Sequence, residues 1–140
     1  MDFQFAEDFK KLTIQCPPNH YKPENRIAFR WVFDDINDAE NFKPVFYKNP
    51  TRSRKFPEEA QCKSLALSLF ATEKQAKDRF DFFKDSNGAK VYDTLGTMVA
   101  QSNINEQDGV NSEPDKTGHF SHHPVAGHQY EKRFVITSKL

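Results

Sequence analysis

The most restrictive feature of the sequence is a change of hydrophobic period within residues 63–84. From position 64 to position 69, leucine alternates with serine or alanine, which is the two-residue period of a strand with one apolar face. Thr72 and Gln75 then have the spacing of a capping box, which satisfies free N–H groups at the start of a helix. The apolar residues that follow share one helical face: Ala76, Phe80 and Phe83. The stretch therefore predicts a strand followed by a helix over residues 73–84.

The remaining elements are predicted from shorter patterns. Residues 3–12, FQFAEDFKKL, have the apolar spacing of a short amphipathic helix, which Cys16-Pro17-Pro18 ends. Alternating patterns predict strands at 26–33, 89–100 and 132–137, with Gly96 marking a bulge or a close backbone approach. We therefore expect an α+β fold: a mostly antiparallel sheet of four to five strands, one central helix and an N-terminal helix.

The length of 140 residues fits a single domain, 1–140, that buries about two-thirds of its unfolded surface. Within it, residues 1–25 are expected to form the N-terminal helix and a proline-rich loop. Residues 101–118 are polar and rich in Asn, Asp and Gly, which predicts a mobile loop.

Charge and cysteine content limit the partners and the compartment. Twenty basic residues balance twenty acidic ones, so we expect neither general nucleic-acid binding nor membrane association. No apolar run approaches the roughly 20 residues of a membrane span, and the first residues lack the apolar core of a signal peptide. Cys16 and Cys62 lack CxxC spacing, which favours two separate reduced thiols over a pair and predicts a cytoplasmic protein.

Four of the five histidines lie in GHFSHHPVAGHQY, between residues 119 and 128, and form the strongest chemical signal in the chain. Imidazole exchanges protons near neutral pH and binds zinc, copper and iron. If the segment is extended, His119, Ser121 and His123 face one side, whereas Phe120 and His122 face the other.

Three interpretations of these histidines remain open. His119 or His123 can act as a general acid or base, or as a substrate contact, where the 101–118 loop meets a strand. A metal site would combine His119, His123 and His128 with Glu131 or Asp115. The backbones of His119 and His123 would be about 13 Å apart in an extended segment, which disfavours one shared ion, so we assign no metal ligand. In the third interpretation they are loop histidines with polar neighbours.

The segment AFRWVF, a polar crossover and LALSLFATEKQA together resemble the small ADP-ribosyltransferase-like domains, including the RES-type NAD-consuming toxins. The resemblance covers residues 26–100. In those families an early strand supplies an Arg or His to the dinucleotide, and a later strand supplies a Ser or Tyr beside the nicotinamide. The resemblance therefore implies these roles for Arg30 and Ser68, with Glu131 as a third position. Tight packing of Ser64, Ala66 and Ser68 under a helix is the structural alternative.

The function predicted from the sequence is a small enzyme or toxin-like effector that acts on a nucleotide or another anionic ligand. A transferase or NAD-consuming activity is the one that the resemblance implies. The cofactor is left open between NAD and another nucleotide, with a divalent metal less favoured. The sequence lacks GxGxxG, GxxxxGK[ST], HExxH and GxSxG, which excludes the enzyme classes that those motifs mark.

The predicted site joins four catalytic candidates, His119, His123, Arg30 and Ser68. Arg30, Ser64 and Ser68 are the predicted ligand-binding residues, and we expect the groups to meet in one cavity over the serine face of the leucine-rich strand. The alternative is a non-enzymatic interaction module, an inhibitor or adaptor, that binds a protein partner. Its aromatic anchors would be the N-terminal helix with Phe5 and the loop with Phe46 and Tyr47.

Overall fold

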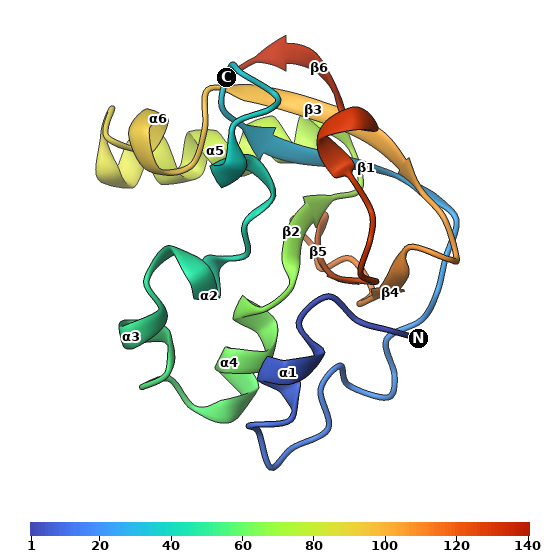
Figure 1. The fold of residues 1–140 in the computed structure, drawn as a ribbon. Coiled ribbons are helices and arrows are strands. Elements are labelled where there is room, and N and C mark those ends of the chain that lie inside the picture. The colour runs from blue at the N-terminus through green and yellow to red at the C-terminus, as the bar shows by residue number, and fades with distance from the viewer.

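The fold is built on one antiparallel sheet of six strands, in the spatial order β4-β5-β2-β1-β3-β6 (Figure 1). The computed structural model describes all of residues 1–140. The strands are β1 (Arg26–Val32), β2 (Leu67–Phe70), β3 (Met98–Ile104), β4 (Gly109–Asn111), β5 (His119–Pro124) and β6 (Val135–Lys139). The α+β class and the antiparallel pairing are confirmed, with one strand more than expected.

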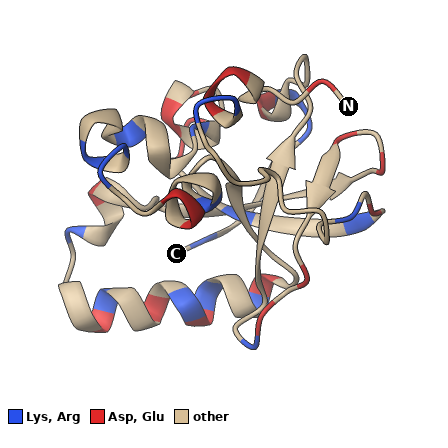
Figure 2. Ribbon diagram, turned by 90° about the horizontal axis from the view of Figure 1, so that it is seen from below, with Lys and Arg blue, Asp and Glu red and all other residues tan.

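The longest helix, α5 (Glu73–Asn87), covers one face of the sheet. It begins as the sequence predicts, because the backbone N–H of Gln75 donates to Oγ1 of the N-cap residue Thr72 at 3.1 Å. Its buried face packs against Phe29, Phe70 and Val99 of the sheet. Charged residues of both signs alternate along its exposed side (Figure 2), which keeps this face of the helix in water.

The opposite face of the sheet carries the larger part of the core. Two short 3-10 helices, η1 (Ala39–Phe42) and η2 (Tyr130–Lys132), bring aromatic rings onto it. The buried side chains of this cluster are Ala28, Val32, Leu67, Leu69, Ala100, Ile104, Phe120, Tyr130 and Phe134. Aromatic rings therefore supply much of the buried apolar surface.

The other helices are short and precede or follow the central strand–helix unit. They are α1 (Ala6–Phe9), α2 (Val45–Lys48), α3 (Pro50–Ser53), α4 (Glu58–Ser64) and α6 (Val91–Thr94). Helices α1 to α4 lie together beyond the N-terminal start of β2 (Figure 1). None of the helices is long and apolar enough to cross a membrane.

The predicted boundaries differ from the structure most at three places, and the N-terminal helix and the last strand are also shifted, to Ala6–Phe9 and Val135–Lys139. The strand expected to start near residue 64 starts at Leu67, because α4 extends to Ser64. The strand expected over 89–100 is the short helix α6 followed by β3, which continues to Ile104. The range 101–118, expected to be a mobile loop, contains the end of β3 and all of β4. Gly96 marks the predicted close approach, since a Cβ there would lie 2.8 Å from the carbonyl oxygen of Val32.

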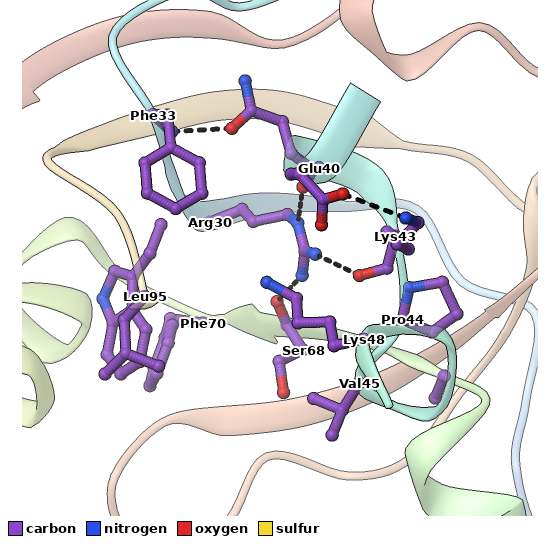
Figure 3. Close-up of a pocket in the computed structure, with 13 residues that line it drawn as sticks. Arg30, Phe33, Glu40, Lys43, Pro44, Val45, Lys48, Ser68, Phe70 and Leu95 are labelled. Carbon is purple, nitrogen blue, oxygen red and sulfur yellow. Dashed lines mark hydrogen bonds and ion pairs between the residues drawn. The ribbon is translucent and has the colours of Figure 1, made fainter. Parts of the chain in front are cut away.

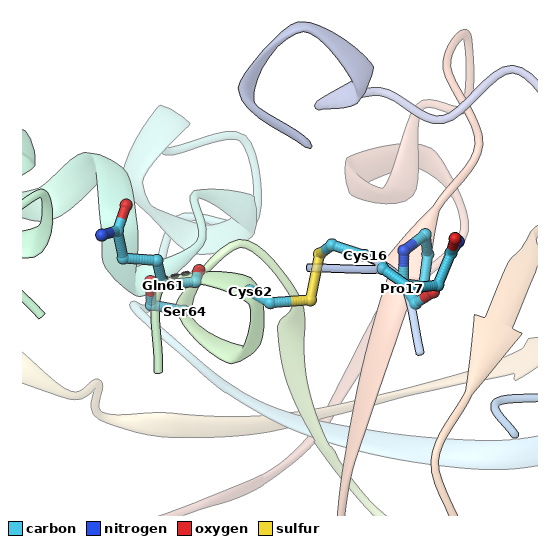
Figure 4. The surroundings of a disulfide bond; sticks show 6 residues. Cys16, Pro17, Gln61, Cys62 and Ser64 are labelled. Carbon is cyan, nitrogen blue, oxygen red and sulfur yellow. Dashed lines mark hydrogen bonds between the residues drawn. A yellow bond between two sulfur atoms is a disulfide. The ribbon is translucent and has the colours of Figure 1, made fainter. Parts of the chain in front are cut away.

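Cys16 and Cys62 form a disulfide, with their Cα atoms 5.8 Å apart. The expectation of two separate thiols is therefore wrong. The bond connects the loop after α1 to helix α4 (Figure 4), and sequence spacing had no means of showing that these segments meet. A cytoplasmic location, which rested partly on free thiols, stays a prediction.

Candidate functional site

The largest hollow among the described cavities is a cleft of about 670 Å³ between the N-terminal loop, α4 and the β4–β5 hairpin. The loop contributes His20 and Tyr21, and the helix contributes Glu59, Cys62 and Lys63. The hairpin contributes Ser112, Glu113, Asp115, His119 and Ser121. Three segments that are far apart in the sequence thus enclose one polar cleft.

His119 and Ser68 share a hydrogen bond, with 2.7 Å between Nε2 of the histidine and Oγ of the serine. The two residues lie on the adjacent strands β5 and β2, where Ser68 is opposite Ser121 and His119 is opposite Phe70. They are therefore diagonal neighbours on one face of the sheet. The His119 ring also packs edge-on against Phe70, with 5.6 Å between ring centroids. The imidazole is thus fixed by a hydrogen bond and by an aromatic contact.

Burial lowers the pKa of His119 below its usual value. The carboxylate of Asp115 opposes this shift, whereas the charges of Arg79 and Lys63 lower the pKa further. A lowered histidine pKa means that the imidazole is neutral at pH 7. A neutral imidazole is the form that accepts a proton in general base catalysis.

The second ring nitrogen of His119, Nδ1, has no hydrogen bond within the protein and is not among the buried atoms that lack a partner. Nδ1 is therefore accessible to solvent. His119 lines the cleft, and Nδ1 is the ring nitrogen that has no partner within the protein.

Asp115 holds the turn that leads into β5. Its carboxylate accepts hydrogen bonds from the backbone N–H and hydroxyl of Thr117 and from the backbone N–H of His119, at 2.6 to 3.2 Å. These bonds outweigh the effect of burial and lower the pKa of Asp115. Asp115 therefore positions the backbone of His119 and does not bond to its ring.

Arg30 is buried, with 8 % of its surface exposed, and all the hydrogen bonds of its guanidinium go to backbone carbonyls (Figure 3). It donates to the carbonyls of Asn41, Ser68 and Lys43 at 2.7, 2.9 and 3.4 Å. Burial lowers its pKa to about 10. Figure 3 shows that Ser68 directs its carbonyl toward Arg30 and its hydroxyl away from it. In this structure Arg30 connects β1, β2 and the segment around η1.

The predicted site residues do not share one cavity. Arg30 and Ser68 line a pocket of about 110 Å³ beside Lys48, whereas His119 lines the cleft. Ser64 is at the end of α4, where its hydroxyl donates to the carbonyl of Gln61 at 2.8 Å. Of the predicted site residues, only Arg30, Ser68 and His119 are therefore in contact. Ser68 joins them, because its carbonyl accepts a hydrogen bond from Arg30 and its hydroxyl shares one with His119.

The other clustered histidines have separate environments. His122 is fully buried and is bonded through both nitrogens, to Oδ1 of Asn111 at 2.6 Å and to the hydroxyl of Tyr130 at 2.8 Å. Burial lowers its pKa to about 3, so it is a neutral core histidine. His128 stacks on Tyr130, and its Nδ1 is 3.5 Å from the carboxylate of Asp108. Donor atoms of His119, His123 and His128 do not converge on one point.

The aromatic anchors of the alternative function contact one another inside the molecule. Phe46 is buried, and the Tyr47 ring packs against Phe5 with 5.4 Å between centroids. The Tyr47 hydroxyl donates to the carboxylate of Asp8. These contacts attach α1 to α2. The aromatic side chains that an interaction module would use to bind a partner are therefore already in contact with one another.

Sequence reasoning missed the contribution of the N-terminal loop and of Lys63 to the cleft. No pattern in residues 13–22 indicates that this loop faces the histidine strand, and the β-bridge between Lys22 and Asn111 that helps to place it is a tertiary contact. No family model, curated protein or solved structure matches this chain.

Proposed function

We propose that the protein is a small enzyme that binds an anionic ligand in the cleft and uses His119 for proton transfer. The observation that carries this proposal is the 2.7 Å hydrogen bond between Ser68 and His119, which holds a neutral imidazole at the wall of the cleft. Ser68 acts as a positioning residue, because its hydroxyl contacts the ring nitrogen that is directed away from the accessible Nδ1.

The Ser68 hydroxyl can hold either neutral tautomer of His119. When the hydroxyl donates a hydrogen bond to Nε2, Nδ1 carries the hydrogen and can donate a hydrogen bond to a ligand. When the hydroxyl accepts a hydrogen bond from Nε2–H, Nδ1 presents a lone pair and can act as a base. The lowered pKa of His119 keeps both neutral tautomers available at pH 7.

Lys63 is the group that favours an anionic ligand. It lines the cleft, it forms none of the salt bridges of the chain, and its charge is close enough to lower the pKa of His119. The cleft also carries the carboxylates of Glu59, Glu113 and Asp115, of which only Asp115 has internal hydrogen-bond partners. A ligand phosphate or carboxylate would therefore have a single cationic partner in the cleft, the unpaired ammonium group of Lys63.

A nucleotide is the first ligand class to test, and NAD the first member of it. The resemblance to ADP-ribosyltransferase-like domains suggests a transferase or NAD-consuming, toxin-like activity, with roles for Arg30 and Ser68. Because the guanidinium of Arg30 already donates to three carbonyls, the proposal places ligand contact on Lys63 and His119.

The test is a titration of isotope-labelled protein with NAD and, separately, with ADP. We expect the backbone amide signals of Lys63, His119 and Ser121 to shift in both titrations, and nicotinamide to be released in the first. His119→Ala should abolish release while ADP still binds, and Lys63→Ala should weaken binding. His128→Ala, outside the cleft, is the matched control. Absence of shifts with either ligand, or shifts confined to the Arg30 pocket, would contradict the proposal.

A further inference from the structure

His123 lies in a second cluster that the proposed function does not use. One nitrogen of His123 and the sulfur atoms of Cys16 and Cys62 all lie within 4.8 Å of one another. The three residues come from the loop after α1, from α4 and from β5. It is the one group of three or more metal-binding side chains whose donor atoms converge in this structure.

The imidazole of His123 has no hydrogen-bond partner, although it is fully buried at 0 % exposure. The rings of Phe9 and Tyr21 enclose it, with centroids 5.4 and 5.7 Å away. A buried polar group without a partner costs about 1–3 kcal/mol. The adjacent His122, equally buried, has both nitrogens bonded. The unpaired nitrogens of His123 therefore require an explanation, and a metal ion that accepts the single lone pair of the neutral ring accounts for one of them.

Two thiolates and one imidazole are a donor set that zinc binds in proteins. Zn–S bonds of about 2.3 Å and Zn–N bonds of about 2.0 Å place tetrahedral donors roughly 3.5 to 4 Å apart. The three donor atoms lie within 4.8 Å of one another, and the two sulfur atoms are bonded to each other, so the sulfur atoms have to move apart when the disulfide is reduced and a metal binds. Cys62 and Tyr21 also line the cleft, from which a water molecule can complete a four-coordinate site.

We propose that the reduced protein binds one Zn²⁺ through Cys16, Cys62 and His123, as an alternative to the disulfide. A dithiol reductant transfers two electrons and two protons to the disulfide and becomes a disulfide itself. The two resulting thiols release their protons to water when Zn²⁺ binds, and His123 coordinates through its neutral lone pair. The site is independent of the proposed function, because none of its ligands takes part in proton transfer at His119.

The first experiment compares zinc retention by the reduced and oxidised full-length protein. Protein is reduced with a phosphine, mixed with zinc sulfate, passed over a gel-filtration column and analysed for metal. One zinc per chain is expected after reduction, and less than about a tenth of that without it, because disulfide sulfur is not a thiolate ligand. Reduced protein that retains no zinc overturns the proposal.

The second experiment identifies the ligands on the unmodified chain, so it does not depend on a variant that folds. Cobalt bound in place of zinc should give the absorption of a tetrahedral thiolate complex. Zinc should shift the ring-nitrogen signals of His123 and leave those of His122 in place. A metal complex without a thiolate band, or one that leaves the His123 signals unchanged, overturns the three-ligand site.

Variants give an independent measure. His123→Ala should weaken zinc binding at least about tenfold, since loss of even an outer contact to a metal ligand costs 10–100-fold. His128→Ala, a histidine of the same segment outside the cluster, should bind zinc like the parent protein. Circular dichroism of both variants in the reduced form separates loss of a ligand from loss of the fold. Equal zinc affinity of folded His123→Ala and the parent would also overturn the site.

Discussion

Oγ of Ser68 and Nε2 of His119 lie 2.7 Å apart across β2 and β5, although 51 positions separate the residues in the sequence. The antiparallel register makes this contact, because it places both residues on one face of the sheet as diagonal neighbours. A serine that lines one pocket thus orients a histidine that lines another.

Ser68→Ala should change the tautomer of His119 without unfolding the protein. The substitution removes the only hydrogen bond to the His119 ring, so the preference between Nε2–H and Nδ1–H should weaken. Ring-nitrogen chemical shifts measure this directly. His122, which has two partners of its own, is the internal control and should keep its signals. An unchanged His119 spectrum would show that Ser68 does not position the ring.

Arg30→Ala should lower the free energy of unfolding by about 3 kcal/mol, because it leaves a cavity and removes the donors of three backbone carbonyls. Arg30→Lys should be intermediate, since one ammonium group cannot reach all three acceptors. Urea denaturation followed by circular dichroism measures both effects. Arg52→Ala, on the exposed side of α3, is the matched control. Parent-like stability of Arg30→Ala would instead favour the predicted role as a ligand anchor.

Gly109→Ala should destabilise the fold by at least about 2 kcal/mol. A non-glycine residue at positive φ is strained, and the added Cβ would collide with a backbone atom of the neighbouring strand. Gly109 has a φ of 149°, and a Cβ there would lie 2.0 Å from the carbonyl oxygen of His123. Gly127→Ala is the matched control, because Gly127 also has a positive φ but has no atom within 4 Å of the added Cβ. Thermal melts should show the larger decrease for Gly109→Ala, and equal decreases would contradict the assigned packing.

Asp108→Asn should reduce stability at pH 7 and have little effect in acid. Asp108 is buried, which raises its pKa, but the hydrogen bonds from Arg133 and from the backbone of Asn105 outweigh burial and lower it. A lowered carboxyl pKa stabilises the fold above the unfolded-state value, about 3.9, and this contribution is lost as the pH falls through the folded-state pKa. Urea denaturation at pH 7 and at pH 3 measures the difference between the two proteins. A difference that stays constant with pH would contradict the ion pair.

Sequence patterns predicted correctly those helices and strands that are determined by a few neighbouring residues. The alternation of residues 26–33 and the cap at Thr72 both correspond to observed elements, β1 and the start of α5. The small residues at the start of the leucine-rich stretch fit a strand and a helix equally well. The observed helix α4 extends to Ser64 because its buried Cys62 is held against the N-terminal loop, which is a tertiary effect.

The site was predictable only in part for the same reason. The histidine segment was recognisable, and its alternation placed His119 and His123 on one side of β5. Sequence spacing could not show that His119 would meet Ser68 and His123 would meet two cysteines, because these contacts depend on strand order and on the path of the N-terminal loop. Arg30 was a predicted ligand-binding residue, but two of its three carbonyl partners, Asn41 and Lys43, come from a crossover that lacks any regular pattern.

The register of β1 and β2 contains a single residue pair, Phe29 with Phe70. Backbone pairing within the six-stranded sheet is therefore narrowest between β2 and β1, where side-chain packing in both core clusters and the Arg30 side chain hold the two three-stranded halves together. Ser68 and His119 belong to the same half, so a change in the angle between the halves would carry both residues together. The hydrogen bond between Ser68 and His119 would thereby be kept when the sheet bends, while the small pocket between β1 and β2 would open or close.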